Sequence, residues 1–109
     1  MKDDTFFLHH ILDEIMFLEE QFHGKSFEDL LDNPLLQRAS IRSLEIIVEA
    51  VKNLSDNLKS SNQDIKWKEI AGMRDKLIHH YFGVDLEVVW DVVENRLPEL
   101  RITVKNALK

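Results

Sequence analysis

The sequence predicts an all-α protein, an antiparallel bundle of four to five helices. Apolar residues recur at steps of three and four along most of the 109 residues, which is the spacing of one helix face. No segment alternates apolar and polar residues over the length of a strand. Glycine occurs three times and proline twice, so few residues interrupt a helix. This length, without a linker rich in glycine, serine or proline, predicts one domain, residues 1–109.

The first predicted helix begins near Asp4 or Thr5 and ends at Gly24. One face of it carries the apolar residues Leu8, Ile11, Leu12, Ile15, Leu18 and Phe22. Acidic side chains occupy the opposite face, which we expect to be solvated. A short helical turn follows, with Ser26 as its N-cap.

The second predicted helix has a clear start, because Asn33 is a good N-cap and Pro34 suits the first helical position. Its apolar stripe comprises Ile41, Leu44, Ile47, Val48, Val51, Leu54 and Leu58. We expect it to end around Lys59, before the polar run 60–63.

The third predicted helix extends from about Asp64 to Phe82, with Gly83 in the position of a left-handed C-terminal residue. Asp85 then caps a fourth helix. Pro98 is expected to kink this helix, because proline lacks an amide proton and its ring clashes with the preceding turn. Apolar residues continue the stripe beyond the proline, which favours a kink over an end.

The charges are unevenly spread. The formal net charge is −6, from 14 basic and 20 acidic side chains, which argues against a passive coat for nucleic acid. Residues 1–33 have a balance of −7, residues 34–84 of +2 and residues 85–109 of −1. The second and third predicted helices are therefore the only basic part of the chain, so a local cationic site on an acidic body is possible.

Several classes of site are excluded by composition. Cysteine is absent, which removes disulfides, thiolate metal ligands and thiol nucleophiles. The histidines at positions 9, 10 and 23 lack the spacing of metal ligands, so we expect no metal and no cofactor. Four amphipathic helices make a small core, so dimerisation would be favourable. Phe6 and Phe7 are candidates for such a dimer or partner surface, whereas Trp67 and Trp90 are expected in the core.

The chain is expected to be cytoplasmic and to have no membrane partner. Two acids stand near the N-terminus, where a signal peptide carries cations. No apolar run approaches the roughly 20 residues that cross a bilayer. The absence of cysteine agrees with a reducing compartment.

The third predicted helix carries the most informative residues. Arg74 occupies a position of the apolar stripe by spacing, which is costly unless the guanidinium is paired, solvated or bound to a ligand. His79 lies four residues after Asp75, so this carboxylate can orient the imidazole. Arg74 and His79 are about 140° apart around a helix axis and do not share a face. From spacing alone, an arginine paired with a carboxylate and an ordinary histidine remain the simpler interpretation.

The residues from Arg74 to Tyr81 fit the pattern R-x4-H-x-Y. Together with Gly83-Val84-Asp85 and Leu97-Pro98-Glu99-Leu100, this segment resembles the HepT-type toxins of the HEPN superfamily. The chain length, the all-α prediction and the absence of cysteine agree with that resemblance.

The resemblance implies a helical bundle that dimerises, with both copies of the motif at one cleft. It implies a metal-independent RNase that acts as the toxin of a type VII toxin–antitoxin system. Arg74 and His79 would be catalytic, and Asp75 occupies the polar position after the arginine. The implied partner is a minimal nucleotidyltransferase antitoxin, which silences the toxin by transferring AMP to Tyr81. A larger assembly of toxin and antitoxin is compatible with this scheme.

These residue types suit RNA cleavage by the substrate's own 2′-hydroxyl, which needs a base, an acid and a cation. His79 can act as the base, and Arg74 can bind phosphate oxygens. In a two-fold dimer, one His79 can be the base and the other the acid. Lys76 and the basic second helix can hold the RNA backbone.

Two other interpretations stay open. The chain could be a non-catalytic helical partner that helps a minimal nucleotidyltransferase to hold its substrate. Alternatively, it could be a helical dimer in which Arg74 is paired for structural reasons only.

Overall fold

The computed structural model describes residues 3–77 and 85–109, and every regular element in these two ranges is helical. The all-α prediction is therefore confirmed. In chain order the elements are α1 (Asp4–Phe22), α2 (Phe27–Asp32), α3 (Pro34–Lys52), α4 (Asp56–Ser60), α5 (Trp67–Ala71), α6 (Met73–Leu77), α7 (Leu86–Asp91), the π-helical turn η1 (Val92–Arg96) and α8 (Leu97–Ala107). Within the same two ranges, no helix is long and apolar enough to span a membrane.

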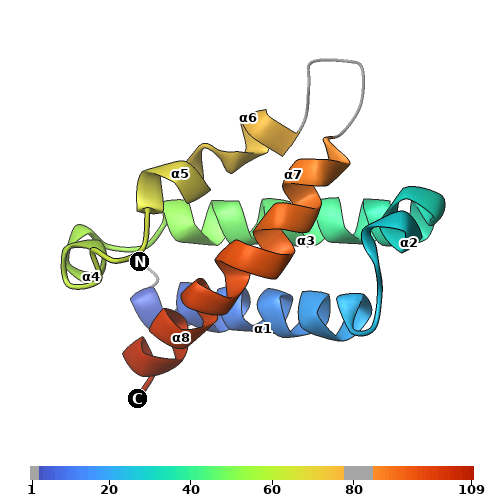
Figure 1. The fold of residues 1–109 in the computed structure, drawn as a ribbon. Helices are drawn as coiled ribbons and strands as arrows, with labels where there is room; N and C mark the ends of the chain where they lie inside the picture. Colours follow the sequence, from blue (N-terminus) through green and yellow to red (C-terminus); the bar gives the residue numbers. More distant parts are fainter. Residues whose placement is uncertain (1–2, 78–84) are drawn as a thin grey trace.

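The two long helices α1 and α3 lie side by side and antiparallel (Figure 1). The run α7–η1–α8 crosses them diagonally, while α5 and α6 follow α3 along its other edge (Figure 1). Their apolar faces meet in one core, whose fully buried members include Ile11, Ile15, Leu18, Leu30, Leu44, Ile47, Val51, Leu77, Val89, Leu97 and Leu100. Trp67 and Trp90, which were predicted to be core residues, are partly buried and pack against its edge.

Local capping explains where the helices begin. Asp3 caps α1, and Asn33 caps α3 with Pro34 at the start of that helix. At α2 the Ser26 side chain accepts from the Asp29 N–H, and the Asp29 carboxylate accepts from the Ser26 N–H at 2.8 Å, a reciprocal capping box. The predicted starts of the first helix, the short turn and the second helix are confirmed. The same is true of the fourth, because the Asp85 side chain accepts from the Val88 N–H.

The second helix is shorter than predicted, ending at Lys52 rather than Lys59. Its apolar spacing continues, but Ser55 caps a new helix, α4, by accepting a hydrogen bond from the Leu58 N–H. The intervening turn places Leu54 in the core, where it is 4% exposed. The chain thus changes direction where a strong N-cap competes with continuation of the helix.

The third predicted helix is also divided. It begins at Trp67 rather than Asp64, and Gly72 separates α5 from α6. Glycine is a weak helix residue because it loses much conformational entropy on ordering. The predicted end at Phe82 and the predicted left-handed Gly83 lie outside the described residues.

The last helix continues past Pro98, as predicted, through a widened turn. The Leu97 N–H donates to the Val92 carbonyl five residues earlier, the bond of a π-helix. This turn lies directly before the proline, whose ring and missing N–H do not fit an uninterrupted α-helical ladder.

Candidate active site

The first part of the predicted motif lies on α6. Arg74, Asp75 and Lys76 are all exposed there, while Met73 and Leu77 of the same helix are buried. The predicted catalytic His79 and the predicted modification site Tyr81 lie outside the described residues.

The apolar stripe of this segment differs from the predicted one. Ile70, Met73 and Leu77 face the core, so position 73 and not position 74 continues the stripe. The prediction that Arg74 interrupts an apolar face is therefore wrong. The guanidinium is not desolvated by burial, because the Arg74 side chain is 59% exposed.

Arg74 is paired with Glu45 of α3. The Arg74 Nε and the Glu45 Oε2 are 3.6 Å apart, and the Glu45 side chain is 29% exposed. This distance makes the contact an ion pair and not a hydrogen bond. A carboxylate partner for Arg74 was one of the predicted alternatives, but its identity was not, since 29 residues separate the two in sequence.

A groove of about 440 Å³ adjoins the motif, between α5–α6 and the run α7–η1–α8. Its apolar lining consists of Ile65, Ile70, Met73, Val88 and Val92. Three cationic side chains, Lys66, Lys76 and Arg96, lie among its charged residues. The carboxylates in the lining are Asp64, Glu69, Asp91 and Glu99. Lys76 thus belongs both to the motif helix and to the groove.

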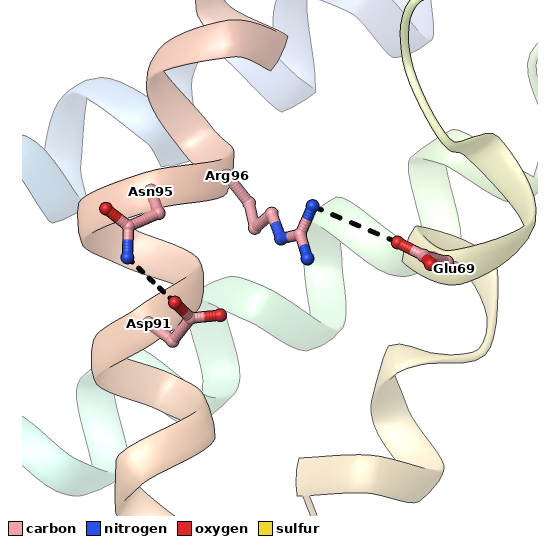
Figure 2. Close-up of polar contacts among 4 residues, drawn as sticks. All are labelled: Glu69, Asp91, Asn95 and Arg96. Atoms are coloured by element: carbon pink, nitrogen blue, oxygen red, sulfur yellow. Dashed lines mark hydrogen bonds and ion pairs between the residues drawn. The ribbon is translucent and has the colours of Figure 1, made fainter.

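Figure 2 shows the polar contacts in this groove. Arg96 points from η1 toward Glu69 on α5, and its Nη1 lies 4.0 Å from the Glu69 Oε2. Beside it, the Asn95 amide donates to the Asp91 carboxylate at 2.7 Å (Figure 2). The Arg96–Glu69 pair joins the two sides of the groove, and both side chains are about half exposed. Sequence reasoning missed this pair because its members come from different predicted helices.

A second, smaller hollow of about 230 Å³ lies on the α1–α3 face. Phe6 and Phe7 line it together with His10, and the Phe6 and His10 ring centroids are 4.6 Å apart. Glu45 also lines this hollow, so it connects the aromatic cluster with Arg74. In the described part of the chain, no group of three histidine, aspartate or glutamate side chains could hold a metal ion.

Comparison with known proteins decides the family. The family model described as "Ribonuclease HepT-like" matches residues 11–107. The chain belongs to the HepT-like ribonuclease family. The resemblance predicted from the motif is confirmed at this level.

Named relatives of this HepT-like chain come from bacteria and archaea. A protein of Caldanaerobacter subterraneus subsp. tengcongensis, named "Putative RNase", is 50% identical over 100% of this chain and 97% of its own length. A protein of Thermococcus cleftensis, named "Probable ribonuclease HepT", is 45% identical over 87% of this chain and 86% of its own. A third relative, a protein of Methanocaldococcus jannaschii that is also named "Putative RNase", is 42% identical over 89% of this chain and 80% of its own length. No solved structure matches the chain significantly.

Proposed function

We propose that this protein is a metal-independent endoribonuclease, the toxin of a HEPN and minimal nucleotidyltransferase pair of type VII. Membership of the HepT-like ribonuclease family carries the proposal, and the names of the relatives support an RNA substrate. The Arg74 side chain is 59% exposed, which leaves its guanidinium accessible to a phosphate of RNA. Residues 1–109 form one HepT-like domain in this proposal, and it acts in the cytoplasm.

The proposed reaction uses groups that RNA and the motif supply. His79 accepts the proton of a ribose 2′-hydroxyl, and the 2′-oxygen then forms a bond with the adjacent phosphorus. The bond from phosphorus to the 5′-oxygen breaks, and that oxygen takes a proton from a second His79. The product is a 2′,3′-cyclic phosphate. Arg74 stabilises the added negative charge on the phosphate, and Asp75 orients the histidine.

A homodimer supplies the second histidine. On a regular helix, Arg74 and His79 would be about 140° apart around the axis, so a single chain would not place both against one phosphate. A two-fold axis beside the motif brings two copies of each side chain to one cleft. Lys76 holds the RNA backbone next to this cleft, since its side chain is exposed and lines the groove.

The proposed partner is a minimal nucleotidyltransferase antitoxin, with which the dimer can form a larger assembly. Transfer of AMP to Tyr81 would add bulk and negative charge two residues from His79, which would exclude RNA. The alternative is a non-catalytic subunit that helps such an enzyme to hold its substrate. The Arg74–Glu45 ion pair is compatible with this alternative, because it gives the arginine a partner other than RNA.

Cleavage by purified variants separates the two functions. Wild type is expected to cut RNA in the presence of a chelator, and His79→Ala and Arg74→Ala to lose about 10²–10⁴-fold in rate. His9→Ala is the matched control, because His9 is an exposed histidine on α1, away from the motif. If wild type and His79→Ala are equally harmless to cells and equally unable to cut RNA, the enzyme proposal is wrong.

A further inference from the structure

The ion pair between Arg74 and Glu45 joins the helices α6 and α3. Glu45 lies in the middle of the 19-residue helix α3, and its neighbours Leu44 and Ile47 are completely buried. Arg74 lies on α6, and its side chain is on the exposed side of that helix. The position of the carboxylate is therefore set by the core, whereas Arg74 is a long and largely exposed side chain.

The geometry of the pair leaves the guanidinium available. The carboxylate contacts the Nε side of Arg74, and the side chain remains 59% exposed. A guanidinium has five N–H donors in a fixed planar fork, so contact at Nε leaves the terminal nitrogens for a second anion. Contact with Glu45 therefore restricts the direction of the fork without covering it.

Stability does not explain the pair. Exposed ion pairs contribute little to folding, because solvent screens them and ordering of the side chains offsets the attraction. Met73 and Leu77, which are 5% and 1% exposed, already attach α6 to the core. What the pair changes is the set of directions that the Arg74 guanidinium adopts.

We propose that Glu45 is a positioning residue for Arg74 in RNA cleavage. Its carboxylate holds the guanidinium at Nε, so that the terminal nitrogens face the phosphate at which charge develops. This inference rests on the proposed function. It adds a residue outside the motif, on another helix, on which the rate of the chemical step depends.

Two matched substitutions on α3 test the inference. Glu45→Gln removes the charge and keeps the shape. Glu49→Gln makes the same change one turn further along the same helix, at an exposed side chain with no ion pair among the described residues. Both are compared with Arg74→Ala and with the double variant Glu45→Gln/Arg74→Ala. The readouts are kcat and KM on a short RNA, and the Nε–Hε signal of Arg74 in ¹⁵N NMR.

Glu45→Gln is expected to lower kcat on the order of tenfold with little change in KM, within the loss that misplacement of a reacting group causes. Glu49→Gln is expected to match wild type, and the double variant to match Arg74→Ala. In Glu45→Gln only, the Arg74 Nε–Hε signal should shift, and its relaxation should show a more mobile side chain.

Three results would overturn the inference. The first is equal kinetics for the two glutamine variants. The second is faster cleavage by Glu45→Gln, which would make Glu45 a competitor of the phosphate. The third is an Arg74 Nε–Hε signal that is the same in Glu45→Gln as in wild type. If wild type does not cut RNA at all, the proposed function fails, and the NMR comparison still decides whether Glu45 orients Arg74.

Discussion

The Asp4 carboxylate accepts two hydrogen bonds from Ser55, one from the backbone N–H at 2.8 Å and one from the hydroxyl at 2.5 Å. The same Ser55 oxygen accepts from the Leu58 N–H and so caps α4. One carboxylate therefore links the first turn of α1 to the first turn of α4, across 51 positions of sequence. This contact lies just after the end of α3, where the chain changes direction.

Asp4→Ala is expected to lower the free energy of unfolding by about 1 kcal/mol, because it removes two hydrogen bonds to an ionised acceptor at an exposed position. Asp13→Ala, an exposed carboxylate of the same helix, serves as the control and should change stability by less than about 0.5 kcal/mol. Urea unfolding of both variants measures the difference. Equal stabilities would show that the link to Ser55 does not stabilise the fold.

Two glycines offer a matched pair of substitutions. Gly24 follows α1 and has a φ of +72°, and a Cβ added there would meet no atom within 4 Å. Gly24→Ala should therefore cost roughly 1 kcal/mol through backbone strain alone. Gly72 lies in the right-handed region with a φ of −88°, and an added Cβ would lie 3.4 Å from the Lys68 carbonyl oxygen, an ordinary contact. Gly72→Ala should be nearly neutral, and thermal unfolding distinguishes the two.

The capping box of α2 predicts a pH dependence. The backbone N–H of Ser26, and secondarily its side chain, lower the pKa of the Asp29 carboxyl below its ordinary value of 3.8. The folded state thus binds this proton less readily than the unfolded state. The stabilisation is complete above pH 3.8 and is lost as the pH falls from there through the lower folded pKa. Wild type should lose stability over this interval faster than Asp29→Asn, as acid unfolding curves would show. Parallel curves would contradict the capping contribution of the charge.

How much the sequence could predict depended on the range of the interaction. The helix starts that follow the N-caps Ser26, Asn33 and Asp85 were predictable because each cap acts within three residues. The end of α3 was not predictable, because apolar spacing continues to Leu58, whereas the cap residue Ser55 is bound by Asp4, 51 positions earlier in the sequence.

The candidate site shows the same division. The residues around Arg74 were visible as a local pattern, and the family that this pattern indicated is the one that the comparison shows. The exposure of Arg74 was not predictable, because helical spacing allows either position 73 or position 74 to lie between Ile70 and Leu77 on the buried face. Glu45 carries no signal of its own in the sequence, since only the packing of α6 on α3 brings it to Arg74.

Lys76 predicts a salt-dependent contribution to RNA binding. In a His79→Ala background, which prevents turnover, Lys76→Ala should weaken RNA binding and reduce the salt dependence of the affinity by about one unit of slope. Lys105→Ala is the control, because this exposed lysine belongs to α8 and does not line the groove beside the motif. Binding titrations at several salt concentrations provide the slopes. Identical slopes for the two lysine variants would show that Lys76 does not bind the RNA backbone.

Tyr81 is the only tyrosine of the chain, so its modification can be read from the whole protein. Co-expression with the proposed minimal nucleotidyltransferase antitoxin should add the mass of AMP to wild type and not to Tyr81→Phe. The modified protein should cut RNA far more slowly, because the adenylate places a negative charge where the phosphate of the substrate must lie. Unmodified Tyr81→Phe should keep most of its activity, since no step of the proposed reaction uses the phenol. A mass gain that persists in Tyr81→Phe would place the modification elsewhere, and a modified protein with full activity would separate the modification from neutralisation.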